Sequence, residues 1–224
     1  MTSTGNDIVA LKAINVARTI QPNFYAKIIS DKEKDLYDKT FSGKLPLEIY
    51  IWLLWSVKES AYKYLQRLTP DLVFSPTRIL ITLLELPVSN PTVNFEENKI
   101  EGRGFDKGSV YKGIAGFGTD LLYFTSIINN DFIFSVVNCE DKFENTCWGV
   151  QQIDSAEPAH QSKAVREFLL DGLSSLFPGG KWQIEKSPHG YPLILKDGFE
   201  MPILVSLAHH EVWVGYSFQI KNKY

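Results

Sequence analysis

The chain has 224 residues, of which 44% are hydrophobic, 13% aromatic and 22% charged. A chain of this length and composition can bury a core without disulfide or metal staples, so a disordered protein is excluded. The formal net charge of -3 lacks the basic excess that phosphate-backbone binding needs, and we therefore expect no nucleic acid partner.

The cysteine content and the hydropathy favour a reduced, cytoplasmic protein. Cys139 and Cys147 lack the paired spacing of zinc ligands, so we interpret both as partly buried free thiols. Residues 1–10 show no hydrophobic leader, and no apolar run approaches the roughly 20 residues that span a bilayer. We therefore expect no membrane association.

The first elements are a strand and a short helix. Residues 5–14 are typical of a strand that runs into a turn, with Asp7 near the transition, where an aspartate is usually a turn former. Ser30 and Glu33 have capping-box spacing, which predicts a helix over residues 31–37. Glu33 is thus interpreted as a structural cap and not as a catalytic acid.

A long helix and a sheet follow. Residues 46–67 contain no glycine, are rich in Leu, Ile, Tyr and Trp, and stop before Pro70, which predicts one long helix. The polar stretch 139–161 is the expected linker, and apolar spacing predicts a second helix over residues 162–177. Strands are expected at residues 78–86, 110–117, 121–128 and 131–137.

A weak internal repeat suggests two related modules. Residues 125–138 and 205–218 both have the pattern of a hairpin, with apolar runs on either side of a polar pair and an acidic residue. Chance similarity between hairpins is common, so duplication stays open at this point. We expect an α+β fold of two similar modules, residues 1–145 and 146–224, each an antiparallel sheet packed with helices.

Asp7 and Glu59, with Lys63 nearby on the long helix, could form an acidic metal site. Glu59 and Lys63 lie four positions apart on the long helix and hence on one face, where the simple interpretation is a surface ion pair. The aromatic and aliphatic neighbours argue for partial burial, which asks for a partner or a function. If Asp7 meets Glu59, the two carboxylates suit Mg²⁺, with water and phosphate oxygens completing the coordination.

Two segments of the C-terminal half could bind a ligand. The turn at residues 186–192 contains Gly190, which permits close approach of a phosphate or nucleotide to the backbone, although an ordinary loop has the same composition. His209 and His210 fall at an expected hairpin corner, where exposed turn residues and ligands are both reasonable interpretations.

Taken together, these segments resemble the motifs of the 4'-phosphopantetheinyl transferase superfamily. Residues 55–63 (WSVKESAYK) are similar to its Trp-Ser/Thr-x-Lys-Glu-Ser/Ala-x-x-Lys motif, and residues 5–9 (GNDIV) resemble its Gly-x-Asp-Ile motif. Phe24, Ser30 and Glu33 match its Phe-Ser-x-x-Glu region.

Later segments extend the resemblance over most of the chain. Residues 164–170 resemble the arginine helix of the family, residues 189–192 (HGYP) its Gly-Lys-Pro turn, and residues 205–209 (VSLAH) its Ser-x-Ser-His strand. In the two-module, surfactin-type members, these three motifs precede the Asp-Ile and Lys-Glu motifs, whereas here they follow them. The resemblance implies a monomeric, circularly permuted pseudo-dimer with one site between its two modules. In the first module, the hairpin at Asn129 would occupy the position that His209 occupies in the second module.

The resemblance implies transfer of phosphopantetheine from coenzyme A to a serine of an acyl or peptidyl carrier protein. Asp7 and Glu59 would hold Mg²⁺, Glu59 would accept the serine proton, and Lys63 would offset charge on the departing 3',5'-ADP. The implied coenzyme A ligands are Arg166, Lys186, Gly190, Tyr191, Pro192, Ser206 and His209.

Two departures from the family pattern leave a second possibility open. Val9 stands where surfactin-type enzymes have a second acid, so two carboxylates would hold the metal. Tyr191 replaces the lysine of the Gly-Lys-Pro turn and removes one cation, which Lys186 could replace. The alternative to the transferase is an inactive module that binds coenzyme A or a carrier protein.

Overall fold

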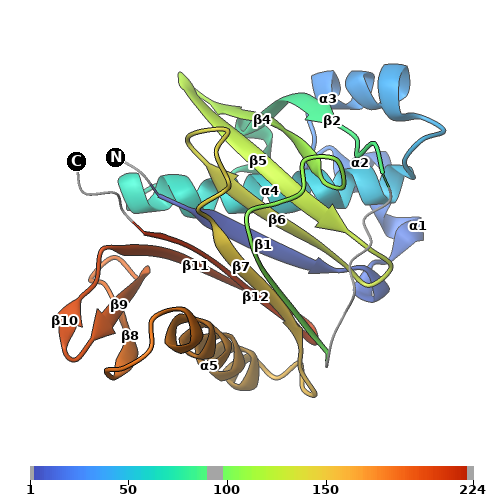
Figure 1. Ribbon diagram of the computed structural model, residues 1–224. Helices are drawn as coiled ribbons and strands as arrows, with labels where there is room; N and C mark the ends of the chain where they lie inside the picture. The colour runs from blue at the N-terminus through green and yellow to red at the C-terminus, as the bar shows by residue number, and fades with distance from the viewer. Residues whose placement is uncertain (1–2, 90–97, 221–224) are drawn as a thin grey trace.

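The protein stacks four layers in the order helix, sheet, sheet, helix (Figure 1). The structure is a computed structural model that describes residues 3–89 and 98–220. Helix α4 (Leu47–Leu68) covers the outer face of a five-stranded sheet, and helix α5 (Pro158–Leu176) covers the outer face of a four-stranded sheet. This arrangement confirms an α+β fold of antiparallel sheets packed with helices.

All strand pairs within the sheets are antiparallel. The first sheet has the order β1 (Gly5–Ala10), β6 (Phe132–Asn138), β5 (Asp120–Ile128), β4 (Tyr111–Phe117) and β2 (Leu80–Glu85). The second has the order β11 (Ile203–His210), β12 (Trp213–Ile220), β7 (Cys147–Gln152) and β3 (Lys99–Arg103). A small third sheet contains β10 (Phe199–Glu200), β9 (Pro192–Lys196) and β8 (Trp182–Lys186).

The short helices lie between β1 and β2. A capping box starts α3 as expected, because the Ser30 side chain accepts from the Glu33 backbone N–H and the Glu33 side chain accepts from the Ser30 N–H. The remaining short elements are a 3₁₀ turn (Leu11–Ala13), α1 (Val16–Thr19), α2 (Pro22–Tyr25), α3 (Asp31–Leu36), a π turn (Tyr37–Phe41) and a second 3₁₀ turn (Pro76–Arg78).

Apolar side chains fill the spaces between all four layers. Leu53, Leu54 and Val57 of α4 are fully buried against the first sheet. Between the sheets, the rings of Phe134 and Trp148 lie 6.0 Å apart. Because strand residues alternate faces, β1 sends Val9 toward α4 and Ile8 toward the second sheet.

The prediction that residues 139–161 form a linker is wrong. It contains β7, which lies in the interior of the second sheet between β12 and β3, and the first turn of α5. The sequence of β7, CWGVQQ, has a glycine and two glutamines, so its composition hides a strand. Gly149 is needed there, because a Cβ would lie within 3 Å of the rings of Tyr216 and Phe168.

The two predicted hairpins exist as β5–β6 and β11–β12. They turn differently: the last pair is Ile128 with Ile133 in the first and His210 with Trp213 in the second. The Asn129 side chain accepts backbone bonds from residues 131 and 132 and thereby closes its own loop. β3 belongs by sequence to the first predicted module but pairs with β7 in the second sheet. The pseudo-dimer relation of the modules stays a proposal.

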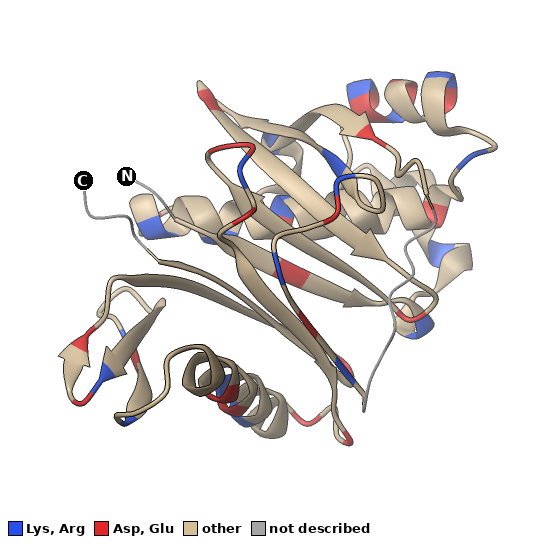
Figure 2. Cartoon of the chain, viewed as in Figure 1, with Lys and Arg blue, Asp and Glu red and all other residues tan. Residues whose placement is uncertain are grey.

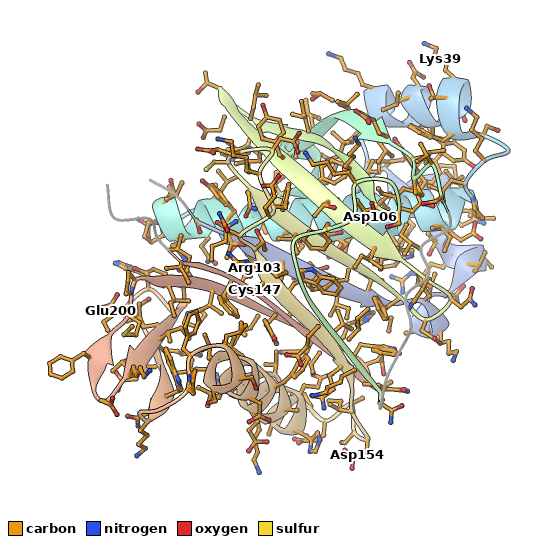
Figure 3. The ribbon with its side chains drawn as sticks, in the orientation of Figure 1. Lys39, Arg103, Asp106, Cys147, Asp154 and Glu200 are labelled. Carbon is orange, nitrogen blue, oxygen red and sulfur yellow. The ribbon has the colours of Figure 1, made fainter. Side chains whose placement is uncertain are left out.

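Both cysteines are free thiols. Figure 3 shows Arg103 and Cys147 beside each other, where they pair in register between β3 and β7. Burial raises the pKa of Cys147, and the charge of Arg103 opposes that shift. Within residues 3–89 and 98–220, none of the helices has the length and apolar character required to cross a membrane.

Candidate active site

Strands β1 and β11, the end strands of the two large sheets, lie side by side (Figure 1). Side chains bridge them: the backbone N–H of Asn6 donates to Ser206 Oγ at 2.9 Å, and that of Ala10 donates to His210 Nδ1 at 2.9 Å. Two outward N–H groups of β1 are thus satisfied by side chains of β11. This junction, with α4 against β1, is where the predicted site residues meet.

Asp7, Lys63 and Glu59 form one charged cluster at this junction. Lys63 Nζ lies 3.1 Å from Asp7 Oδ1 and 3.5 Å from Glu59 Oε1, and it donates to Asn6 O at 3.0 Å. The Asp7 side chain is 7% exposed, whereas those of Lys63 and Glu59 are 25% and 29% exposed. Glu59 and Lys63 therefore form more than a surface ion pair, and Asp7 is no simple turn former.

The charged groups in the cluster shift one another's pKa values. Burial is the main cause that raises the pKa of Asp7 to about 7; Lys63 opposes this shift and Glu59 adds to it. Burial disfavours the charge on Lys63, but Asp7 and Glu59 outweigh it and raise the pKa of Lys63. A cation beside Asp7 and Glu59 would favour the ionised form of Asp7.

Gly5 allows β1 to lie directly on α4. A Cβ at Gly5 would lie 2.0 Å from the carbonyl oxygen of Ser60 and 2.9 Å from the N of Tyr64. These are backbone atoms, which cannot rotate away. The close approach brings Asp7 within reach of Lys63 from the next turn of the helix.

We expect Gly5→Ala to lower the free energy of unfolding by about 3 kcal/mol, because the methyl group forces β1 away from α4. Urea denaturation followed by circular dichroism measures the change. Gly116→Ala is the matched control, since its Cβ has only ordinary contacts at 3.8 Å or more and β4 tolerates it. Equal stabilities of the two variants would contradict the close-packing argument.

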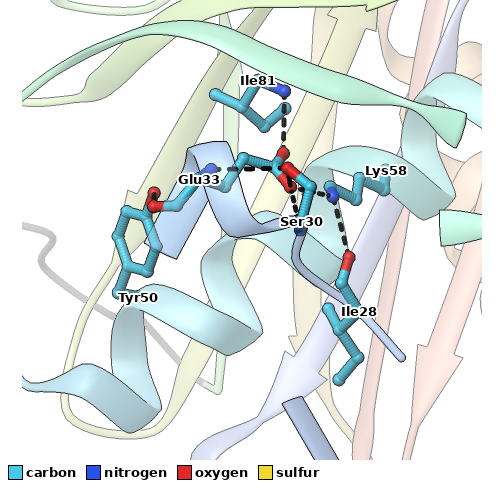
Figure 4. Close-up of polar contacts among 6 residues, drawn as sticks. All are labelled: Ile28, Ser30, Glu33, Tyr50, Lys58 and Ile81. Carbon is cyan, nitrogen blue, oxygen red and sulfur yellow. Dashed lines mark hydrogen bonds and ion pairs between the residues drawn. The ribbon is translucent and has the colours of Figure 1, made fainter. Parts of the chain in front are cut away.

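A buried ion pair holds the helix turn that carries Glu59 (Figure 4). Lys58 Nζ lies 2.7 Å from Glu33 Oε2 and donates to Ile28 O at 2.8 Å. The side chains of Lys58 and Glu33 are 0% and 1% exposed. Glu33 also accepts from the Ile81 N–H at 2.8 Å. Glu33 is thus a cap, as expected, and in addition the partner of a buried lysine.

A cavity of about 530 Å³ opens beside the cluster, between α4, α5, β11 and the β8–β9 turn. It brings together every residue expected to bind coenzyme A, and Lys63 connects it to the cluster. Gly190 has a φ of +88° and open space around its Cβ position, so its backbone is accessible. The lining residues singled out from the sequence are Lys63, Arg166, Lys186, Gly190, Tyr191, Pro192, Ser206 and His209.

The walls of the cavity are cationic. Of the described residues in its wall, Arg67, Arg166 and Lys186 have no carboxylate within ion-pair distance, and the only carboxylate is Glu185. Figure 2 shows basic positions at the end of α4 that lies beside the chain termini, while both signs mix over the rest of the chain. Arg67 and Arg166 are partly buried and Lys186 is exposed, and unpaired cations gathered in one cavity favour an anionic ligand with several charges.

The acidic cluster fits a divalent cation that is shared with a ligand. Asp7 Oδ2 is buried and has no hydrogen-bond partner in the part of the chain that the structure describes. In that same part, no group of three or more His, Cys, Asp or Glu could hold a metal ion. Two carboxylates would therefore need ligand or water oxygens, as is common for Mg²⁺.

One comparison with known proteins found a match. A family model described as the 4'-phosphopantetheinyl transferase superfamily matches residues 3–108. Over these residues, the chain is similar to this superfamily. Neither the curated proteins nor the solved structures contain a significant match to the chain.

The superfamily match covers the acidic cluster and one wall of the cavity. It includes Asp7, Glu59 and Lys63, whereas Arg166 and the turn at residues 186–192 lie beyond it. Val9, at the position of the second acid in surfactin-type members, is 2% exposed and packs in the apolar cluster under α4. An acid there would be buried among hydrocarbons, so Asp7 and Glu59 are the carboxylates that the acidic cluster offers.

Sequence reasoning missed several of the residues that line the cavity. Thr4, Gln66 and Arg67 were not singled out, although Arg67 follows Glu59 and Lys63 at helical spacing on the same face of α4. That periodicity is the signal that could have found Arg67. Ser206 lines the cavity but also accepts from Asn6, so part of its role is to join the two sheets.

Proposed function

We propose that this protein transfers 4'-phosphopantetheine from coenzyme A to a serine of an acyl or peptidyl carrier protein, with Mg²⁺, and releases 3',5'-ADP. The observation that carries the proposal is the cationic cavity joined through Lys63 to two carboxylates. Coenzyme A carries its phosphates in two places, which suits a cavity with several unpaired cations. The superfamily match supports the same chemistry.

Each residue of the cluster has a defined part in the proposed reaction. Asp7 and Glu59 would hold the metal, which would offset charge on the pyrophosphate and polarise its β-phosphorus. Glu59 accepts the proton of the serine hydroxyl as the serine oxygen bonds to phosphorus. The bond from phosphorus to 3',5'-ADP breaks, and Lys63 offsets charge on that leaving group.

The second half of the site binds and orients coenzyme A. Arg166 is held at the wall because it donates to both Ser162 O and Ser162 Oγ, which leaves the rest of its guanidinium fork for a phosphate. Lys186 and His209 add further donors, and Gly190, Tyr191 and Pro192 offer accessible backbone and ring surface. Burial lowers the pKa of His209, and Lys63 adds to this shift, so a bound phosphate would favour its protonation.

The oligomeric state and the cellular compartment of the enzyme are also part of the proposal. A single chain supplies both the carboxylates and the cationic wall, which supports a monomer. Two free thiols support a reducing compartment, which we take to be the cytoplasm.

Mass spectrometry of an apo carrier protein tests the proposal directly. The protein is incubated with coenzyme A, Mg²⁺ and several apo carriers from fatty-acid, polyketide and peptide synthesis. We expect one carrier to gain a phosphopantetheine group, and chelation of Mg²⁺ to prevent the gain. A lack of gain on all carriers, together with measurable coenzyme A binding, would favour the inactive binding module instead.

A further inference from the structure

Arg67 lies where the cavity lacks the lysine of the Gly-Lys-Pro turn. Its guanidinium carbon lies 4.8 Å from the centre of the Tyr191 ring, and its Nη2 donates to Val205 O at 2.5 Å. The guanidinium is thus fixed between the turn at residue 191 and strand β11. Only one of its five N–H donors is used in that bond, and it has no ion pair in the described part of the chain.

We propose that Arg67 binds the 3'-phosphate of coenzyme A and so makes the site selective for the 3'-phosphorylated nucleotide. The inference rests on the proposed function, because it assigns one group of the same substrate. Tyr191 stands where the family motif has a lysine, and Arg67 of α4 supplies a cation in its place.

The spacing along α4 separates two phosphate positions. Lys63 is tied to Asp7 and Glu59, where the pyrophosphate reacts. Arg67 is one helical turn further along, with about 5–6 Å between Cβ atoms of such a pair. Its Tyr191 contact holds it at the cavity wall, so the two cations meet different phosphates of one ligand. A planar fork suits a terminal phosphate, which offers several oxygens for bidentate bonds.

Calorimetric titration with coenzyme A and with 3'-dephospho-coenzyme A tests this assignment. We expect Arg67→Gln to weaken coenzyme A binding by about 10- to 100-fold, as for loss of a charge-assisted bond. Binding of 3'-dephospho-coenzyme A should change by less than about 2-fold. The second ligand also reports folding, because a disrupted cavity would lose both.

Three further variants sharpen the test. Arg78→Gln is the matched control: Arg78 also lies over an aromatic ring, that of Phe117 at 5.2 Å, but outside the cavity. It should bind both ligands as the wild type does. Arg67→Lys, which keeps the charge and the stem, should lose less coenzyme A affinity than Arg67→Gln. Adding Tyr191→Lys to Arg67→Gln should restore affinity for coenzyme A, because a lysine at residue 191 returns a cation to the same place.

Two results would overturn the assignment of Arg67. One is Arg67→Gln binding coenzyme A as tightly as the wild type. The other is an equal loss for both ligands in Arg67→Gln and Arg67→Lys with unchanged thermal unfolding. A wild type that binds neither ligand would overturn the proposed function itself, and Arg67 with it.

Discussion

The Glu59→Gln variant should lose phosphopantetheine transfer by about 10²- to 10⁴-fold while keeping its fold. The amide cannot accept a proton from the serine hydroxyl, and it removes one of the two carboxylates that would hold Mg²⁺. Because Glu59 is partly exposed and its oxygen lies 3.5 Å from Lys63 Nζ, the change in the free energy of unfolding should be under about 1 kcal/mol. Initial rates of carrier modification and urea denaturation measure the two effects.

Glu48→Gln is the matched control for this prediction. Glu48 is in the first turn of α4, about 16 Å along the helix axis from Glu59, so it is remote from the cluster. Its variant should transfer at the wild-type rate. The Glu59→Gln variant should also show a lower pKa for Asp7, because Glu59 adds to the upward shift of that group. A Glu59→Gln enzyme with full activity would disprove the assigned role of Glu59. The transferase proposal would then still be tested by mass spectrometry of the carrier protein.

Local signals in the sequence predicted both long helices and the strands of the five-stranded sheet, but not how the elements assemble. The long helix, expected at residues 46–67, is α4 at Leu47–Leu68, because a glycine-free apolar run ended by a proline has few alternatives. β7 was missed, since its neighbours β12 and β3 come from distant parts of the chain and determine its burial. A strand that is stabilised by its partners need not show a period of its own.

The site was predicted as residue types but not as a geometry. The spacing of Glu59 and Lys63 placed them on one face, while their contact with Asp7 depends on β1 packing against α4 at Gly5. Nothing local to residue 5 reveals that contact. The periodicity of α4 puts Arg67 on the face of Glu59 and Lys63, but its place over Tyr191 depends on two elements that only the tertiary fold brings together.

The ion pair between Lys58 and Glu33 leads to the largest expected effect on stability. We expect Glu33→Gln to lower the free energy of unfolding by about 3–5 kcal/mol, because the charge of Lys58 then remains buried without the carboxylate that compensates it. Asp38→Asn is the matched control. It breaks the Lys34–Asp38 pair nearby, where Asp38 is 54% exposed, and should cost less than about 1 kcal/mol.

The pH dependence and a double variant separate lost charge pairing from lost packing in Glu33→Gln. Burial lowers the pKa of Lys58 and Glu33 opposes this, so without Glu33 the pKa of Lys58 falls further. Between the lowered pKa of Lys58 in the folded chain and its ordinary pKa in the unfolded chain, the unfolded chain binds more protons, so the variant should regain stability as pH rises through that interval. Glu33→Gln with Lys58→Met removes the buried charge and should be more stable than Glu33→Gln alone. If denaturation midpoints of Glu33→Gln do not change with pH and the double variant is no more stable, the cost lies in the hydrogen bonds of Glu33 to Ser30 and Ile81 and not in the stranded charge of Lys58.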